Sequence, residues 1–255
     1  TGYYEFLPGI TLTDAYTIMS EGAEKQFSVS LVEGLRMRDW YQQLAAIDSL
    51  NQDLPAFEAL YEVLVSEGSF CENSYQSVEG CLLADTYFYV YGDSALSILK
   101  RAYRQMDITL DRLWAQRFKD VPLNSPYEAL IMASIIEKET AVPEERTVIS
   151  GVFSNRLSLG MRLQTDPTVI YGIGDAFDGN ITRKHLRTAT PYNTYVIKGL
   201  PPTPIAMAGK AAIKAALSPK TTDALYFVAK GDGSHQFSNT LEEHNAAVRQ
   251  FQLKR

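Results

Sequence analysis

The stretch from residue 125 to residue 140 combines signals for the start of a helix with a nearly unbroken apolar run. Ser125 suits the N-cap, Pro126 suits the first helical position and Glu128 completes a capping box. The apolar side chains behind them are Leu130, Ile131, Met132, Ala133, Ile135 and Ile136. Because a helix that is apolar around most of its circumference is usually buried, the pattern predicts a core helix over residues 126–140.

This helix carries two carboxylates into its last turn. Glu137 and Glu139 are two positions apart, so they lie on different faces. At roughly 100° per residue, Glu139 points further than Glu137 from the polar arc that Ser134 and Lys138 form. We therefore expect Glu139 to be a desolvated acid with a raised pKa, and Glu137 to be a structural or orienting partner. A solvated last turn with ordinary surface charges fits the spacing equally well.

The periodicity of the remaining chain predicts an α+β fold. Strand-like patterns cover residues 3–7, 27–32, 86–91 and 225–229, and residues 231–234 are typical of a hairpin turn. Helical patterns cover residues 12–20, 36–50, 57–66, 94–118, 143–160 and 206–217, and a last helix follows a cap at Thr240. We expect a small α/β subdomain over 1–50, a connecting and mostly helical region over 51–120, and a mixed helical and β catalytic domain over 121–255.

Residues 161–204 are turn-rich, polar and aromatic, and we expect them to form functional loops. Their amides, carboxylate and aromatic rings suit sugars, whose hydroxyls need planar polar partners and whose C–H faces stack on rings. Asp166 is a candidate second carboxylate of a glycosidase. His235, further on, is a candidate to line a pocket. Ordinary turn chemistry is the alternative for the loop residues, and simple exposure is the alternative for His235.

Composition narrows the choice of function. The chain has 255 residues, 45% of them hydrophobic and 21% charged, which is ordinary for a globular protein. A formal net charge of −6 gives no basic footprint for nucleic acid. We find no apolar run of about 18 residues and no signal peptide. The chain begins at Thr1 and runs directly into a strand-like segment, so we expect it to be a piece of a longer protein.

Cysteine and histidine spacing excludes several kinds of site. Cys71 and Cys81 are ten residues apart, and either a disulfide or two buried thiols is compatible with that spacing. The three histidines lack metal-ligand spacing, so we expect no metal. The sequence contains neither a phosphate-binding glycine loop nor a G-x-S-x-G elbow, and we expect no cofactor.

Several motifs in a fixed order resemble the YceG-like family of endolytic murein transglycosylases, over essentially all of residues 120–250. They are Ile135-Ile136-Glu137-Lys138-Glu139-Thr140, Asn155-Arg156-Leu157, Met161 to Tyr171, Tyr192-Asn193-Thr194-Tyr195, Gly199-Leu200-Pro201-Pro202, Tyr226-Phe227-Val228, His235-Gln236-Phe237 and Glu243-His244-Asn245. A weaker match at Val32-Glu33-Gly34 resembles the LysM-like subdomain of the family, which we assign to residues 1–50.

The resemblance implies cleavage of the β-1,4 bond between N-acetylmuramic acid and N-acetylglucosamine in peptidoglycan, leaving a 1,6-anhydro-muramyl end. One carboxylate performs this reaction in the family, and it aligns with Glu139. Residues expected to hold the glycan are Gln164, Asp166, Tyr192, Asn193, Thr194, Tyr195, His235 and Glu137. Family members are tethered to the bacterial inner membrane by one N-terminal helix, act on its periplasmic side and work alongside glycan polymerases, so we expect the same here.

Three other functions compete with this interpretation. A hydrolytic muramidase leaves a reducing sugar end instead of an anhydro end. A non-catalytic peptidoglycan-binding module would use Glu139 only structurally. A pyridoxal-phosphate lyase needs a Schiff-base lysine and a phosphate cradle; the sequence shows no cradle, and Lys138 falls on the expected polar arc.

Overall fold

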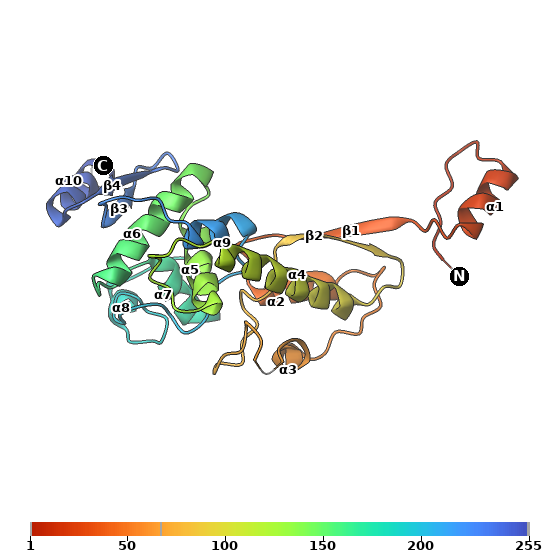
Figure 1. Cartoon of the computed structure of the whole chain (residues 1–255), viewed down its shortest axis with the longest axis horizontal. Helices are drawn as coiled ribbons and strands as arrows, with labels where there is room; N and C mark the ends of the chain where they lie inside the picture. The colour runs from red at the N-terminus through yellow and green to blue at the C-terminus, as the bar shows by residue number, and fades with distance from the viewer. Residues whose placement is uncertain (1, 67, 254–255) are drawn as a thin grey trace.

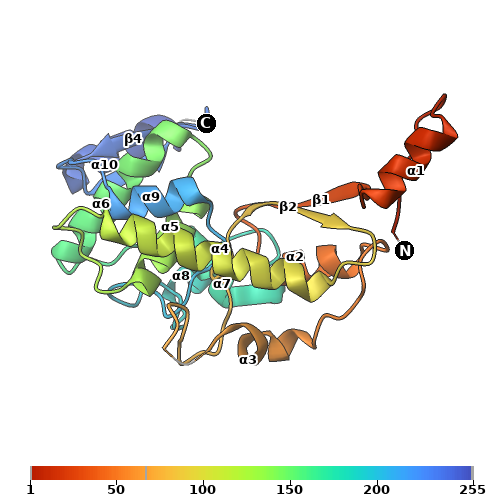
Figure 2. The same cartoon turned by 45° about the vertical axis from the view of Figure 1, so that its right-hand side comes forward.

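The computed structural model describes residues 2–66 and 68–253 and shows an elongated molecule (Figures 1 and 2). Helix α1 (Leu12–Ser20) stands at one end, apart from the rest of the chain, and the C-terminal hairpin and its helix stand at the other. Between them lie two hydrophobic cores that meet along helix α4.

The front part of the chain contains one two-stranded antiparallel sheet and three α-helices. Its elements are β1 (Gln26–Leu31), α2 (Met37–Ala45), η1 (Phe57–Ala59), α3 (Leu60–Leu64), β2 (Asp85–Val90) and α4 (Ala95–Ala115). Strand β1 pairs with β2, so that Gln26 lies opposite Val90 and Leu31 opposite Asp85. The first core therefore includes residues on both sides of position 50, with Trp40 completely buried at its centre.

The second part of the chain is built around helix α5. Its elements are α5 (Pro126–Glu139), η2 (Pro143–Glu145), α6 (Arg146–Ser158), α7 (Asp166–Ile173), η3 (Gly174–Ala176), α8 (Arg183–Arg187), α9 (Lys210–Leu217), β3 (Tyr226–Ala229), β4 (His235–Ser238) and α10 (Leu241–Phe251). Every residue of α5 from Ala129 to Ile136 is buried, as its apolar pattern predicts, and α4, α6, α7 and α9 surround it.

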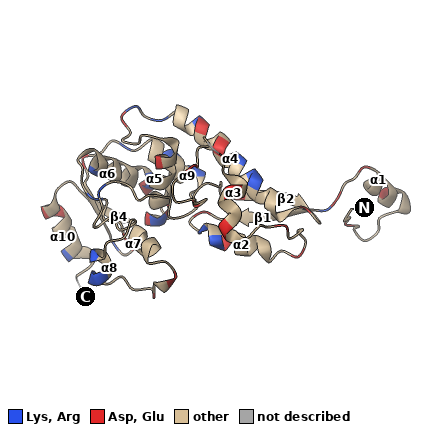
Figure 3. Cartoon of the chain, turned by 90° about the horizontal axis from the view of Figure 1, so that it is seen from below, with Lys and Arg blue, Asp and Glu red and all other residues tan. Residues whose placement is uncertain are grey.

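Helices with two small antiparallel sheets confirm the α+β class. The LysM-like character of the front and the boundaries at residues 50 and 120 stay predictions. Along α4, the basic residues Lys100, Arg101 and Arg104 come before the acidic residues Asp107 and Asp111, so the helix carries both signs of charge (Figure 3). Within the described ranges, none of the helices is both long and apolar enough to span a membrane.

Three local expectations are wrong. Residues 3–7 form no strand: Tyr3 contacts Tyr91 and Phe27 through its ring, and no neighbouring strand pairs with this segment. The helix expected over 36–50 ends at Ala45. The loop region 161–204 contains helices α7 and α8, because Asp166-Pro167 begins a helix instead of a turn.

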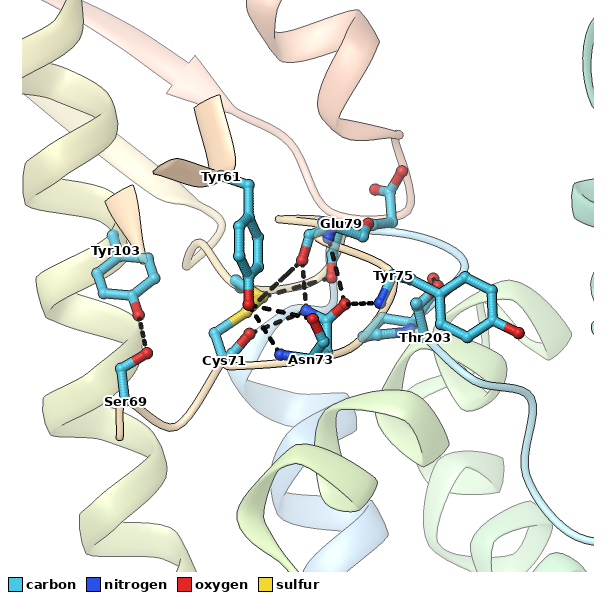
Figure 4. The surroundings of a disulfide bond; sticks show 11 residues. Tyr61, Ser69, Cys71, Asn73, Tyr75, Glu79, Tyr103 and Thr203 are labelled. Atoms are coloured by element: carbon cyan, nitrogen blue, oxygen red, sulfur yellow. Dashed lines mark hydrogen bonds between the residues drawn. A yellow bond between two sulfur atoms is a disulfide. The ribbon is translucent and has the colours of Figure 1, made fainter. Parts of the chain in front are cut away.

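Cys71 and Cys81 are joined by a disulfide, with their Cα atoms 6.0 Å apart. Asn73 organises the loop that the disulfide closes (Figure 4): its amide donates to the carbonyls of Cys71 (2.9 Å) and Ser77 (2.8 Å). The hydroxyl of Tyr61 accepts from the amide N–H of Asn73 at 2.9 Å. Of the two alternatives that the sequence left open, the structure therefore contains the disulfide.

Candidate active site

A cavity of about 530 Å³ lies where α5 ends. Its walls come from the last residue of α5, the segment 163–166 that leads into α7, strand β3, and helix α10. Five of the residues expected from the sequence line it: Glu139, Gln164, Asp166, Tyr195 and His235. The fold thus gathers side chains from positions almost 100 residues apart around one carboxyl group.

Glu139 is the C-terminal residue of α5, and the backbone turns away into an extended conformation at Thr140. Burial raises the pKa of Glu139 to about 7. The hydroxyl of Thr165 donates a hydrogen bond to Oε1 and opposes this rise, whereas the charge of Asp166 adds to it. Near neutral pH this carboxyl is therefore divided between its protonated and ionised forms.

The segment before α7 aims Thr165 at Glu139. Gln164 has a φ of 52°, in the left-handed region that residues other than glycine seldom adopt. Thr194 holds this conformation, since its carbonyl accepts from the amide of Gln164 (3.2 Å) and its hydroxyl accepts from the amide of Thr165 (3.0 Å). A backbone held in an uncommon conformation beside a buried acid is typical of functional sites.

Arg156 ties three segments of the cavity wall together. It donates from Nε to the carbonyl of Leu225 (2.6 Å) and from Nη1 to the carbonyl of Leu163 (2.8 Å). Its guanidinium also lies 5.0 Å from the ring centre of Tyr226. These contacts attach α6 to the start of β3 and to the segment before α7. Arg156 therefore holds these parts of the cavity wall in place.

Two carboxylate pairs orient further side chains at the cavity. Glu145 lies 2.6 Å from Nδ1 of His235 and accepts from the amide of the same residue at 2.8 Å. Although burial opposes it, the hydrogen bond with His235 holds the pKa of Glu145 below its usual range. Tyr195 donates its hydroxyl to Asp166 at 2.6 Å. Each pair fixes the position of a polar side chain that lines the cavity.

Four residues expected to bind substrate do not line this cavity. Asn193 is buried and gives its amide to the carbonyls of His185, Leu186 and Thr188. Thr194 bonds to Thr165 and Thr168. Tyr192 packs on Tyr171 and bonds to Thr203. Glu137 accepts from the amide of Gly209 (2.9 Å) on another side of α5.

The polar arc expected on α5 is also wrong in part. Ser134 is completely buried. Its hydroxyl is satisfied there, since it donates to the carbonyl of Ile131 (2.7 Å) and accepts from the amide of Ile205 (3.0 Å). Burial raises the pKa of Glu137 as well as that of Glu139. The two acids differ in what they face: Glu137 is held by a backbone amide, whereas Glu139 opens onto the 530 Å³ cavity.

Sequence reasoning missed several cavity residues. Thr165 is the hydrogen-bond donor to Glu139, and Tyr226, His244 and Asn245 line the same space. His244 stacks on Tyr226 with ring centres 5.2 Å apart. All four belong to the motifs quoted above, so motif membership was the signal that pointed to them. Among residues 2–66 and 68–253, no cluster of histidine, cysteine, aspartate and glutamate is placed to hold a metal ion.

An α+β protein with a half-buried carboxylic acid of raised pKa at the end of a core helix, facing a cavity, has the features of an enzyme that performs acid–base chemistry. The chain belongs to the YceG-like family, whose profile matches residues 1–250.

Two named relatives and one solved structure, all similar to this chain, support this assignment. The chain is 33% identical to the endolytic murein transglycosylase of Bacillus subtilis, over 98% of this chain and 72% of that protein. It is 32% identical to that of Streptococcus pneumoniae, over 67% of this chain and 32% of that protein. A crystal structure of a YceG-like protein from Listeria monocytogenes is 34% identical, with a TM-score of 0.70 over 95% of this chain and 83% of that one.

Proposed function

We propose that this chain is a murein transglycosylase that cleaves inside peptidoglycan strands, at the bond between N-acetylmuramic acid and N-acetylglucosamine. Two relatives carry the name endolytic murein transglycosylase, which supports the reaction class. The observation that carries the proposal is the position of Glu139, which ends a core helix, opens onto a polar cavity and has its pKa raised by burial to about 7.

One carboxyl group is sufficient for this reaction. Protonated Glu139 donates its proton to the glycosidic oxygen as the bond from that oxygen to C1 of the muramic sugar breaks. The resulting carboxylate then takes the proton from the C6 hydroxyl of the same sugar, and O6 bonds to C1. The products are a free hydroxyl on one fragment and a 1,6-anhydro ring on the other, and Glu139 is again protonated. Intramolecular attack needs no water and benefits from proximity.

A second carboxylate in the cavity favours a hydrolytic reaction instead. Asp166 lines the same cavity, and its charge contributes to the raised pKa of Glu139. A second carboxylate is what a muramidase needs to activate water or to attack the sugar. However, Asp166 accepts a hydrogen bond of 2.6 Å from Tyr195, which engages one of its two oxygens. The transglycosylase therefore remains our first proposal and the muramidase the second.

Replacing Glu139 with glutamine tests the proposal. We expect the Glu139→Gln variant to lose cleavage of purified glycan strands by at least about 10³-fold, because an amide can neither donate nor accept the required proton. Glu144→Gln is the matched control, since Glu144 is an exposed glutamate outside the cavity. Mass spectrometry of the wild-type digest gives the reaction class, because an anhydro end is lighter than a reducing end by one water.

Each outcome of this digest has a separate meaning. Reducing ends would replace the transglycosylase with a muramidase, and no product at all would leave a glycan-binding module. Activity retained in Glu139→Gln but lost in Glu137→Gln would move the acid to Glu137. Circular dichroism and thermal unfolding of each variant show whether a loss of activity reflects a loss of fold.

We further propose that the enzyme acts on the outer side of the bacterial inner membrane, alongside glycan polymerases, through a membrane anchor outside the chain described. The disulfide between Cys71 and Cys81 supports an oxidising compartment. Labelling of a tagged fusion of this protein in intact cells tests the location. A fusion found in the cytoplasm would overturn the proposed location.

A further inference from the structure

A second cavity of about 380 Å³ lies on the other side of the α5 end and shares Glu139 with the first. Its walls are the last turn of α5, the residue Arg146 at the start of α6, and the segment 32–34 that leads from β1 towards α2. Glu139 therefore lines both cavities. The C-terminal hairpin forms part of the first, and the front of the chain forms part of the second.

The front wall of the second cavity is anchored to the catalytic part of the chain. The amide of Gly34 donates to the carbonyl of Met207 (2.8 Å), and the amide of Met207 donates to the carbonyl of Leu35 (2.8 Å). Lys138, on the last turn of α5, donates to the carbonyl of Gly34 at 3.1 Å. One hydrogen bond to α5 and two to Met207 thus hold Gly34 and Leu35 in place, so the second cavity has a fixed front wall.

Arg146 is incompletely satisfied inside this cavity. Its side chain is only 17% exposed, and its nearest carboxylate is Glu137, at 3.7 Å from Nη2 to Oε1. Among the described residues, its buried Nε has no hydrogen-bond partner. Glu137 already accepts from the amide of Gly209. A guanidinium carries five N–H donors. In the part of the chain that the structure describes, this half-buried one has a single carboxylate partner at 3.7 Å, so a ligand that brings an acceptor would satisfy donors that the fold leaves free.

We propose that the glycan strand continues past Glu139 into this second cavity, where Arg146 binds an acyl oxygen of a sugar. The inference rests on the proposed function, because cleavage inside a strand requires sugars on both sides of the acid. Two groups on the glycan present such an oxygen: the acetamido carbonyl, which every sugar carries, and the lactyl carboxyl group, which only the muramic sugar carries. Arg146 is thus a substrate-binding residue at some distance from the bond that breaks.

Calorimetry in the uncleaving Glu139→Gln background measures this binding without turnover. The two probes are a chitin tetrasaccharide, which lacks lactyl groups, and a peptide-free tetrasaccharide of alternating N-acetylmuramic acid and N-acetylglucosamine units. We expect adding Arg146→Gln to weaken binding about tenfold or more, since hydrogen bonds to charged groups contribute that much. Loss with both probes assigns the acetamido carbonyl, and loss with the muramyl probe alone assigns the lactyl group.

A cavity-filling variant tests the same inference without touching Arg146. The side chain of Val32 is 50% exposed and lines the second cavity, so Val32→Trp fills space without disturbing a core. Val63→Trp is the control, at a residue 39% exposed on α3 and outside both cavities. We expect kcat/KM on glycan strands to fall at least tenfold for Val32→Trp, mainly through KM, and to stay within about twofold for Val63→Trp.

The two proposals fail in different ways. Unchanged binding and cleavage in both Arg146→Gln and Val32→Trp would overturn the second subsite, although the wild-type enzyme would still cleave. Absence of cleavage by the wild type would overturn the proposed function, although calorimetry would still report the subsite. If Arg146→Gln lowers the unfolding temperature because Glu137 loses its partner, Val32→Trp decides the question.

Discussion

The ionisation of Glu139 depends mainly on burial and on two neighbours, Thr165 and Asp166. Burial and the charge of Asp166 favour the protonated acid, and the hydroxyl of Thr165 favours the carboxylate by donating to it. A pKa near 7 suits a group that must first give a proton and then accept one at neutral pH. In the proposed mechanism, Thr165 therefore lowers the pH at which the acid is lost.

Replacing Thr165 with valine removes that hydrogen bond, the largest influence that opposes burial. The pKa of Glu139 then rises further, so the protonated form persists to higher pH. We expect the alkaline fall of kcat/KM to move upward by about 1 pH unit in Thr165→Val, since a hydrogen bond to a charged group is worth roughly that much. A pH–rate profile on glycan strands measures it.

Thr168→Val is the matched control for this shift. The hydroxyl of Thr168 hydrogen-bonds to that of Thr194 (2.8 Å) and to the carbonyl of Thr165 (2.7 Å), and in the described structure it makes no hydrogen bond to Glu139. Its loss should change stability and leave the alkaline limb where it is. Equal shifts in the two variants would show that the cluster acts only through packing.

Among the secondary-structure elements, α5 was the most predictable and the segment 161–204 the least. Caps and apolar run placed α5 over 126–140, and the helix covers Pro126–Glu139. Asp166-Pro167 suits a turn and a helix start equally, so local sequence could not distinguish the loop from α7. Tertiary contacts favour the helix, since the hydroxyl of Thr194 accepts from the amide of Thr165 just before α7.

Local sequence also could not show which of the residues expected to bind the glycan have structural roles instead. Asn193 resembles a sugar-binding amide in the sequence, yet its three acceptors are carbonyls of residues 185–188. Ser134 resembles a surface residue, yet an amide 71 positions later in the chain donates to it. The polar partner of a side chain lies outside its own sequence window, so polarity alone does not separate binding residues from buried structural ones.

The loop closed by Cys71 and Cys81 is an element whose stability can be tested directly. We expect the Cys71→Ser, Cys81→Ser double variant to lose about 3 kcal/mol of unfolding free energy, because the disulfide restricts the unfolded chain over a separation of ten residues. Urea unfolding with and without a reducing agent measures this. Reductant should lower the midpoint of the wild type to that of the double variant and leave the variant unchanged; a wild-type midpoint insensitive to reductant contradicts it.

At the scale of the whole molecule, Glu79 connects the front of the chain with the catalytic part. It is buried next to a cavity of about 510 Å³, accepts from the amide of Met37 at the start of α2 (2.9 Å), and accepts from the hydroxyl of Tyr171 in α7 (3.4 Å). Burial raises its pKa from 4.5 to about 7. The folded protein therefore holds a proton here that the unfolded chain releases at lower pH.

This raised pKa makes stability depend on pH with a definite sign. The contribution of Glu79 is complete below about pH 4.5 and is lost as the pH rises through about 7, up to ~3 kcal/mol. We expect the unfolding free energy of Glu79→Gln to fall less than that of the wild type between pH 5 and pH 8, with the remaining fall due in part to Glu139. Denaturant unfolding at several pH values measures it.

Glu58→Gln is the control for this measurement, because Glu58 is exposed and makes no side-chain hydrogen bond in the described structure. Its stability should follow the wild type at every pH. A Glu79→Gln curve as steep as that of the wild type would show that Glu79 stays ionised in the folded protein.

The backbone bonds that join Gly34 and Leu35 to Met207 have a practical consequence for shortening this chain. Met207 is completely buried among front-part residues, although it lies in the catalytic half of the sequence. A fragment starting at Ser125 would retain both acids of α5, yet it would leave Met207 uncovered in water and Glu139 walled on one side only. Such a shortened protein should aggregate sooner and process strands poorly, even with Glu139 intact.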